Sequence, residues 1–262
     1  MNTKELIRTA VIKSIKNFAK KKINKKAKFQ ILDLLIPKER KIRSIVGGLE
    51  TSLGTTLWEP LAKTLAQHNG FEVIENKLEA PTNMPASLQN ILSNILEDRK
   101  SDTPSIDGNE SHSQIKKACQ KFIKSPIDNY TKAPRGFGVD IWLKKNDTNY
   151  FFDTKTVQPN VGTYTKCMEQ VLTWYTYFYA RFPTQQSEAK IVFPYNPDPG
   201  SDFWLKTMNK GRPLDSKHEA LVGNQFWDFC SGEKNTYEAI AKTFEEIAAS
   251  GELTETIYDL LS

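Results

Sequence analysis

Apolar residues recur every three or four positions over most of the chain and alternate with polar residues near its middle. The first spacing predicts helices and the second predicts strands. A polar stretch at 102–113 lacks both patterns and predicts a flexible loop. The predicted helices cover 3–18, 49–70, 87–96, 115–123, 163–181, 237–249 and 252–261, and the predicted strands cover 71–79, 137–144, 150–157 and 189–195.

The order of these elements predicts how the sheet is connected. Two strands joined by a short turn are followed by the helix at 163–181 and then by the strand at 189–195. That strand would lie parallel to one strand of the hairpin, through a right-handed crossover. We therefore expect an α/β fold with a mixed central sheet flanked by helices. The aromatic residues in 163–181 favour a helix packed on this sheet over a platform that stacks nucleic-acid bases.

The hairpin at 137–157 carries charged residues between apolar ones. Its turn is predicted at 146–148, where Asn, Asp and Thr follow one another. Side chains alternate between the two faces of a strand, so Asp153 and Lys155 point the same way. Pairing within the hairpin can bring Asp140 opposite them. Two carboxylates and one ammonium are costly to bury unless they are paired or bound to a metal.

Two carboxylates on one face of a sheet suit Mg²⁺, a hard cation that keeps several waters. Asp140 and Asp153 would hold the metal, and the backbone carbonyl of Thr154 would add a ligand. We expect Mn²⁺ to substitute for Mg²⁺. The alternative is a solvated Asp–Lys ladder on a surface hairpin. The surrounding residues argue against that alternative because they leave little polar surface; they are Val139, Ile141, Leu143, Phe151 and Phe152.

Asp140 followed by Asp153-Thr154-Lys155 resembles the signature of PD-(D/E)XK nucleases, with Val139 in place of the nominal proline. The resemblance implies hydrolysis of a phosphodiester by an activated water. The metal would acidify that water and stabilise the charge that develops on the phosphate. Lys155 would orient the water, deprotonate it or neutralise the phosphate, and the sequence leaves these three roles open.

The helix predicted at 49–70 contains Glu59, which has two interpretations. Nucleases of this type often carry a glutamate on the helix before the sheet, and Glu59 after Gly54 fits that pattern loosely. The resemblance then implies a catalytic role for Glu59 in the metal shell. Alternatively, Thr56 and Glu59 have the spacing of a capping box, which would place Pro60 in the first turn of the helix.

Several longer segments together resemble the TdeIII-type family of type II restriction endonucleases. The resemblance spans residues 45–232 and implies a magnesium-dependent homodimer that cuts double-stranded DNA at a two-fold symmetric site of the GGNCC type. The segments that carry it are the helix at 52–70, GVDIW at 138–142, YFFDTKTVQPN at 150–160, FPYNP at 193–197 and FWDF at 226–229.

Positive charge is concentrated in the first 50 residues, which hold 14 Lys and Arg against four acidic residues, whereas the whole chain has a net charge of +5. A basic helical arm at 1–45 ahead of a nuclease domain at 46–262 suits a polyanionic partner. It is equally consistent with a solvated helix face or with packing against a second subunit.

Other basic and amide side chains are candidates for DNA contacts. Lys132 and Arg135 precede the hairpin in a loop that suits phosphate. Lys166 and Gln170 lie one turn apart on a predicted helix, where they would face either the active site or the DNA backbone. Arg, Lys, Asn and Gln also read base edges in the major groove. For that role the candidates are Asn196, Lys206, Lys210, Arg212 and Gln225, and each is also explained as a surface or phosphate-contacting residue.

The remaining composition narrows the function class. Three widely spaced cysteines indicate neither a disulfide framework nor a zinc site, and no apolar run is long enough for a membrane span or a signal peptide. We therefore expect a cytoplasmic protein. No glycine-rich phosphate loop or nucleophile elbow supports an enzyme of small molecules. Two alternatives stay open: a structure-selective repair or junction-resolving nuclease, and a non-catalytic DNA-binding module with the same fold.

Overall fold

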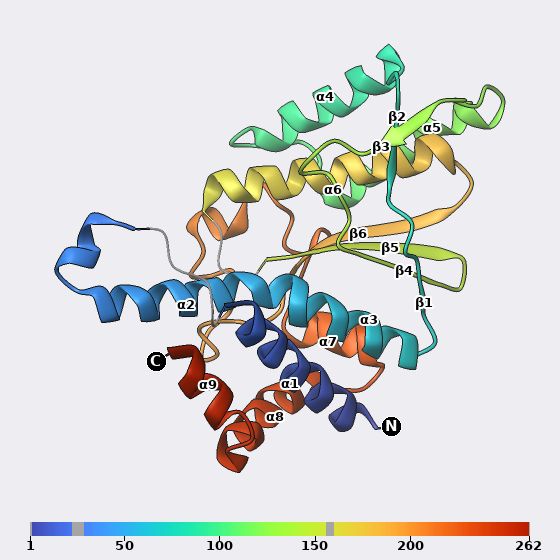
Figure 1. Ribbon diagram of the computed structural model, residues 1–262. Coiled ribbons are helices and arrows are strands. Elements are labelled where there is room, and N and C mark those ends of the chain that lie inside the picture. The colour runs from blue at the N-terminus through green and yellow to red at the C-terminus, as the bar shows by residue number, and fades with distance from the viewer. Residues whose placement is uncertain (1, 23–28, 156–159, 262) are drawn as a thin grey trace. The chain divides into compact units, whose positions relative to one another are not determined.

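The computed structural model describes residues 2–22, 29–155 and 160–261, and gives the backbone alone at 208, 209 and 261 (Figure 1). The chain forms two compact units. Unit 1 comprises Met1–Asn69 and Trp227–Ser262, and unit 2 comprises Gly70–Phe226. The expected division between an arm at 1–45 and a domain at 46–262 stays a prediction.

Unit 2 is built on a five-stranded mixed sheet with the order β1-β4-β5-β6-β7. The first three strands pair antiparallel, whereas β6 lies parallel to both β5 and β7. The parallel β5–β6 pair confirms that the strand after the helix lies parallel to one strand of the hairpin. The strands are β1 (Glu72–Val73), β4 (Ile141–Lys145), β5 (Thr148–Thr154), β6 (Gln186–Phe193) and β7 (Ala220–Val222).

The expected hairpin is confirmed as β4 and β5. Asn146 and Asp147 form its turn with φ of 49° and 61°, a left-handed conformation that these two residue types tolerate and that tight hairpins require. β4 begins at Ile141, so the segment from Phe137 precedes the strand. The amide of Asp140 still donates to the carbonyl of Phe152 at 3.1 Å, which continues the pairing by one step. Residues 156–159 lie outside the described part.

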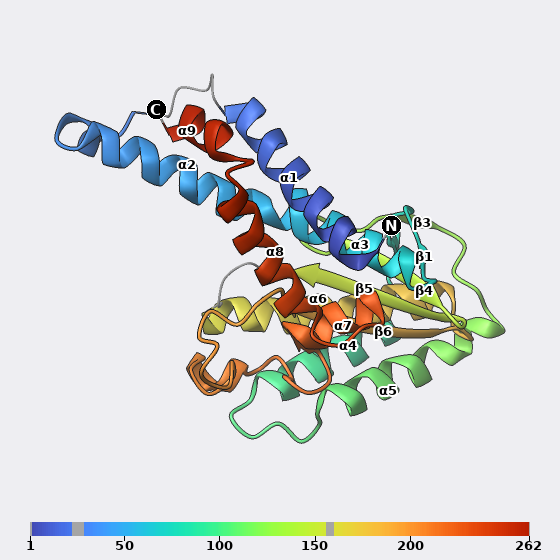
Figure 2. The same cartoon turned by 90° about the horizontal axis from the view of Figure 1, so that it is seen from below.

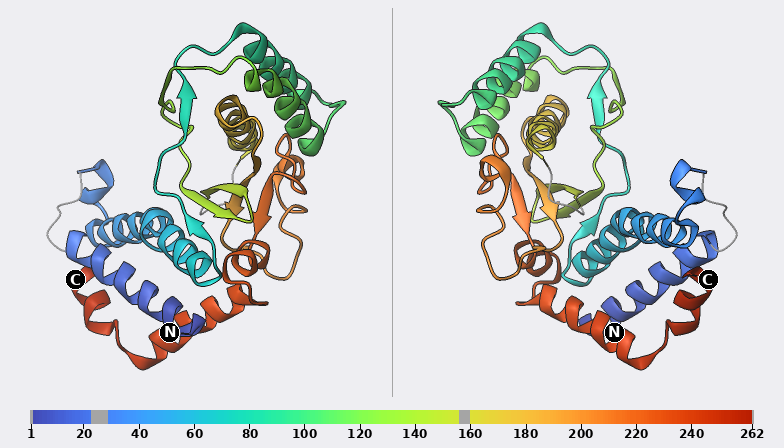
Figure 3. Two further views of the ribbon diagram at one scale, coloured as in Figure 1. Left: turned by 90° about the vertical axis from the view of Figure 1, so that its right-hand side faces the viewer. Right: turned by 90° about the vertical axis from the view of Figure 1, so that its left-hand side faces the viewer.

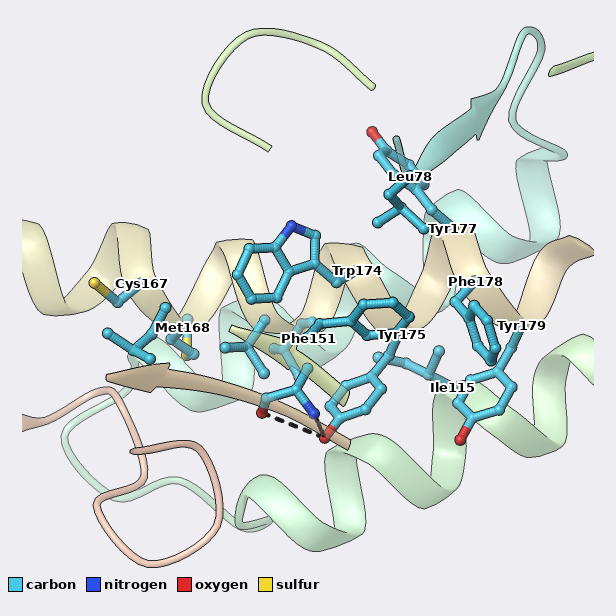
Figure 4. Close-up of a cluster of buried hydrophobic side chains, with 14 of the residues drawn as sticks. Leu78, Ile115, Phe151, Cys167, Met168, Trp174, Tyr175, Tyr177, Phe178 and Tyr179 are labelled. Carbon is cyan, nitrogen blue, oxygen red and sulfur yellow. Dashed lines mark hydrogen bonds between the residues drawn. The ribbon is translucent and has the colours of Figure 1, made fainter. Parts of the chain in front are cut away.

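The long helix α6 (Val161–Arg181) covers the sheet, and its aromatic residues are buried (Figure 4). Asn160 starts the helix because its side chain accepts from the amide of Thr163 at 2.9 Å. Tyr175 reaches the sheet, where its hydroxyl accepts from the amide of Ala189 at 2.8 Å. Trp174 and Tyr179 are fully buried. The interpretation of this helix as core is confirmed.

Two more helices lie on the outer side of α6, so that α6 sits between them and the sheet (Figure 3). They are α4 (Ala86–Lys100) and α5 (Gly108–Cys119), and α5 runs into the 3-10 turn η3 (Gln120–Ile123). The prediction of a strand at 71–79 is mostly wrong, because β1 spans two residues and Glu79 belongs to a separate sheet of two antiparallel strands. That sheet pairs β2 (Glu79–Pro81) with β3 (Tyr130–Lys132).

The loop expected at 102–113 is also wrong over its second half, which forms the start of α5. Asp107 caps this helix by accepting from the amide of Glu110 at 2.8 Å, and the amide of Gly108 donates to Asp215 at 2.9 Å. The first half is ordered by Asp98, whose carboxylate accepts from the amide and hydroxyl of Ser105. Polar residues here satisfy helix ends and turns, which is why they lack the apolar spacing of a helix.

Unit 1 is helical, and its helices come from two segments of the chain, one before unit 2 and one after it. α1 packs against α2, α3, α8 and α9, and the unit's core includes Ile7, Val11, Leu57, Leu61 and Trp227. The helices are α1 (Thr3–Lys22), α2 (Pro37–Leu53), α3 (Glu59–His68), α7 (Asn224–Ser231), α8 (Thr236–Ser250) and α9 (Thr254–Leu261), with a 3-10 turn η1 (Ile31–Leu34) and a π turn η2 (Gly54–Trp58).

The capping box expected at Thr56 and Glu59 is wrong. Thr56 lies inside a continuous helix, where its hydroxyl donates to the carbonyl of Ser52 at 2.7 Å and also meets Ser14 at 2.9 Å. α2, η2 and α3 follow one another without a break, and the π turn comes directly before Pro60. Proline lacks the amide hydrogen that an α-helical turn would use, and a π turn accommodates that loss.

The expected fold class is confirmed: the protein is α/β, with a mixed central sheet flanked by helices, and this arrangement is consistent with a restriction-endonuclease-like fold. A helical segment, α1 to α3, precedes the sheet in the sequence.

A buried ion pair joins α4 to the residue before β7. Both terminal nitrogens of Arg99 bind Glu219 at 2.8 Å, and the two residues are 4% and 1% exposed. Arg99 also donates to Ser111 and to the carbonyl of Pro213. Burial raises the pKa of the Glu219 carboxyl although Arg99 draws it down, so the carboxylate depends on its partner.

We expect Arg99→Met to lower the free energy of unfolding by about 3–5 kcal/mol, because Glu219 would stay buried without its counter-charge. Urea titration followed by circular dichroism measures the change. The control is Lys100→Met at the next position of α4, which removes a surface pair with Glu169 and should cost under about 1 kcal/mol. Equal losses in the two variants would contradict the prediction.

Candidate active site

The end of the hairpin gathers the charged residues that the sequence predicted. Asp140 directly precedes β4, Asp153 is the second-last residue of β5, and Lys155 follows that strand. The amide of Lys155 donates to the carbonyl of Val192 at 2.8 Å, so the parallel pairing with β6 continues past the end of β5. The position of all three groups therefore follows from strand register.

Asp153 is the centre of this cluster. Its carboxylate is 7% exposed and accepts from Lys155 Nζ at 2.8 and 2.7 Å. The same carboxylate accepts from Gln170 Nε2 at 2.6 Å. The Lys155 contact agrees with the expectation that the two side chains share a face of the sheet. Within the described residues, this carboxylate thus has a cationic partner and an amide partner on two sides.

Asp140 lies beside this group, and one of its carboxylate oxygens accepts from the amide of Thr154 at 3.4 Å. Burial, together with the negative charge of Asp153, raises the pKa of Asp140 to about 6. A carboxyl whose pKa is raised by burial and by a neighbouring carboxylate is held at a cost in free energy, and a divalent cation between the two groups would remove that cost. The donor set therefore fits Mg²⁺ or Mn²⁺.

Lys155 is cationic in this arrangement. Burial lowers its pKa, but the attraction and hydrogen bonds of Asp153 outweigh that effect, and the net shift is upward. A protonated ammonium neutralises negative charge and orients a water, whereas it cannot accept a proton. The geometry thus favours two of the three roles that the sequence left open.

The helix α6 holds the segment that precedes Asp140. Gln170 Nε2 lies 3.4 Å from the carbonyl of Gly138, and the indole nitrogen of Trp174 donates to the carbonyl of Phe137 at 2.9 Å. The sequence left Gln170 facing either the active site or the DNA backbone, and its bond to Asp153 was not predicted. The signal was the spacing of Gln170 and Trp174, one helical turn apart on one face of the helix before β6.

The other candidate residues are spread over unit 2. Lys132, Arg135, Lys166, Lys210 and Arg212 are exposed. Lys206 is paired with Asp198, and Asn196 is used within its own loop, where it donates to the carbonyl of Ser201 and accepts from the amide of Asp198. Gln225 accepts from the amide of Val222 at 3.0 Å. Glu59 belongs to unit 1, so its role in a metal shell stays a prediction.

Lys210 and Arg212 line a cavity of about 640 Å³ beside Arg99 and Asp107. Asp107, Asp215 and His218 lie close enough to share a metal ion. Asp215 is already used, however, because its carboxylate accepts from the ring of His218 and from the amide of Gly108. Burial raises its pKa, but these hydrogen bonds outweigh burial and lower the pKa to about 2. This network holds the start of α5 against the loop before β7.

The sequence matches the family model described as "Type II restriction endonuclease, HinfI" over residues 1–248. The chain belongs to this family. The match covers all of unit 2, unit 1 as far as residue 248, and the whole of the Asp140–Asp153–Lys155 cluster. The resemblance to type II restriction endonucleases is therefore confirmed at the level of the class, and the family model that matches is HinfI.

Two curated relatives of this HinfI family chain are restriction enzymes. The type II restriction enzyme MjaII of Methanocaldococcus jannaschii is 25% identical over 209 residues, which is 77% of this chain and 53% of MjaII. The type II restriction enzyme HgiEI of Herpetosiphon aurantiacus is 25% identical over 218 residues, which is 80% of this chain and 73% of HgiEI. The chain thus spans about half the length of MjaII. No solved structure matches the chain.

In the part of the chain that the structure describes, no helix is both long enough and apolar enough to cross a membrane.

The raised pKa of Asp140 predicts a pH-dependent stability. Between the unfolded value of 3.8 and the folded value of about 6, the folded chain holds a proton that the unfolded chain releases. The free energy of unfolding must therefore fall as the pH rises through this window. We expect Asp140→Asn, in chelator, to be more stable than the natural chain by about 1–2 kcal/mol at neutral pH.

Urea titrations at neutral pH and below pH 3.8 test this expectation, and the gain of Asp140→Asn should vanish at the lower pH. Asp102→Asn is the control, because Asp102 is exposed and lies away from the hairpin in sequence. A gain that is the same at both pH values, or that Asp102→Asn shares, would refute the assignment of a raised pKa to Asp140.

Proposed function

We propose that this chain is a magnesium-dependent endonuclease that hydrolyses phosphodiester bonds in double-stranded DNA at a specific site. The observation that carries the proposal is the cluster of Asp140, Asp153 and Lys155 at the end of the hairpin, in a chain of the HinfI restriction endonuclease family. Two crowded carboxylates with an ammonium beside them suit a divalent cation and a phosphate.

Asp140 and Asp153 would hold the metal, with the carbonyl of Thr154 as a further ligand and Glu59 of α3 in the metal shell. The bound metal would supply a water that ionises near neutral pH. Lys155 carries the positive charge that faces the phosphate and orients the attacking water. Gln170 keeps Asp153 in its rotamer, and Trp174 keeps the segment before Asp140 against α6.

DNA would be bound by the exposed basic residues of unit 2. We propose Lys132, Arg135, Lys166, Lys210 and Arg212 as phosphate contacts, because they are exposed and have a long reach. Asn196 and Lys206 are additional candidates whose present partners would have to be exchanged for DNA, whereas we assign Gln170 to Asp153 and not to DNA. A two-fold symmetric DNA site calls for a homodimer. The TdeIII-type resemblance and its GGNCC-type site stay predictions.

Lys155→Ala should lower the rate of DNA cleavage by about a thousandfold or more while DNA binding changes little, because the ammonium acts on the reacting phosphate. The assay is digestion of long unmethylated DNA with Mg²⁺, with Mn²⁺ and with chelator. Lys117→Ala, at an exposed position of α5, is the matched control. Cleavage that survives Lys155→Ala would refute the assignment.

The products of the same digestion separate the remaining alternatives. Discrete fragments support a sequence-specific endonuclease, and sequencing their ends gives the target. A smear, or cleavage confined to branched substrates, would favour a structure-selective nuclease. Tight binding without cleavage in any metal would favour a non-catalytic DNA-binding module.

Gln170→Ala should lower the cleavage rate by about 10–100-fold and raise the Mg²⁺ concentration that is needed for half-maximal rate, because Asp153 would lose the group that orients it. The dissociation constant for DNA, measured in Ca²⁺ or chelator, should stay close to that of the natural chain. Gln170→Glu places a second negative charge beside Asp153 and should be worse than alanine. A change in DNA affinity alone would show that Gln170 contacts DNA instead.

A further inference from the structure

The helix α2 contains no buried residue, although it is 17 residues long and has an apolar stripe. Ile45 and Leu49, in its second half, pack partly against Phe18, Ala19 and Leu260. Most of the large apolar side chains in solvent belong to the segment before the helix, from Phe29 to Ile36, and α2 itself adds Ile42 and Val46; Leu34 and Leu35 are 71% and 78% exposed. The α2 face consists of Phe29, Ile31, Leu32, Leu34, Leu35, Ile36, Ile42 and Val46.

The size of this face matches one side of a protein interface. The exposed fractions of its eight residues correspond to roughly 800 Å² of apolar surface, which is about what each partner buries in a standard-size interface. A monomer seldom exposes an apolar patch of more than a few hundred Å².

A hollow on the same unit is complementary to such side chains. A cavity of about 250 Å³ is lined only by apolar residues, among them Val11, Ile15, Val46, Leu49, Ile247 and Leu260. Val46 belongs both to this cavity and to the α2 face. Unit 1 therefore has protruding apolar side chains on η1, before α2, and an apolar hollow beside the second half of α2.

We propose that the α2 face binds the α2 face of a second copy of this chain, with the two helices antiparallel about a two-fold axis near Ile42. Ile36 and Val46 are separated by about 15 Å along the helix, so this axis places the η1 side chains of each copy at the hollow of the other. The same surface patch serves on both copies, as a two-fold interface requires.

The chemistry of the face selects this occupant. Phosphate and base edges offer no apolar surface of this extent, so the face does not suit DNA. The face also lies where a second chain can reach it, because η1 and the start of α2 extend past the other helices of unit 1 (Figures 1 and 2). Because one surface contains both the protruding side chains and the hollow, two copies of it can fit together.

This inference rests on the proposed function, because it assigns the surface through which two nuclease sites would be joined. Its test does not require DNA cleavage. At micromolar concentration, in chelator and without DNA, sedimentation velocity should give about twice the chain mass of 29.9 kDa. Leu34→Glu/Leu35→Glu should weaken dimerisation by on the order of a hundredfold or more, because two charges would be buried unpaired.

The matched control is Ile123→Glu/Leu205→Glu, which places the same two charges at apolar residues that are 53% and 69% exposed in unit 2. This variant should remain a dimer. Both variants should keep the thermal midpoint of the natural chain at high dilution, because the replaced side chains are exposed. A natural chain that stays monomeric, or a Leu34→Glu/Leu35→Glu chain that stays dimeric, would overturn the proposal.

A cysteine at the two-fold axis provides an independent measurement. Ile42→Cys should form a disulfide-linked dimer under mild oxidation, whereas Leu205→Cys should not, and the natural cysteines Cys119, Cys167 and Cys230 are buried. Linkage of Leu205→Cys with none of Ile42→Cys would overturn the antiparallel arrangement. A dimer that does not cut DNA would refute the proposed function and leave this interface standing, and a monomer that cuts would do the reverse.

Discussion

Repulsion between the carboxylates of Asp140 and Asp153 is the constraint that the rest of unit 2 serves. Burial and like charge both oppose the ionised form of Asp140 beside Asp153. The hairpin fixes their backbones, Lys155 offsets one charge, and Gln170 holds one rotamer. The stability of the sheet thus maintains a site that is unfavourable by itself, as binding sites commonly are.

The support for this site comes from hydrogen bonds that run across the fold. Trp174 and Gln170 project from α6 and reach the carbonyls of Phe137 and Gly138, which precede the hairpin. The same helix binds β6 through Tyr175. One helix therefore fixes the segment before the first carboxylate, the second carboxylate and a neighbouring strand, so a shift of α6 would move all of them together.

The spacing of apolar residues and the residue types of turns predicted those parts of the structure that depend on contacts between near neighbours in the sequence. Alternation along β5 placed Asp153 and Lys155 on one face, and the Asn-Asp turn placed Asp140 near them. Long-range contacts could not be predicted. α5 depends on Asp215, more than a hundred residues away, and the bond of Gln170 to Asp153 depends on how α6 packs. The first part of α2 was not among the predicted helices, because proline interrupts the interior of a helix, whereas Pro37 begins this one.

Unit 1 is discontinuous, with unit 2 inserted between its two segments. This connectivity sets the order in which the chain can fold as it is synthesised. The whole sheet emerges before α8, whose Glu246 binds Lys4 of α1. Until α8 is made, the buried face of α1, including Ile7 and Val11, has no complete partner, although α1 precedes the whole sheet in the sequence. Unit 1 is therefore completed after unit 2, and a chain that lacks α8 exposes apolar surface to chaperones and proteases.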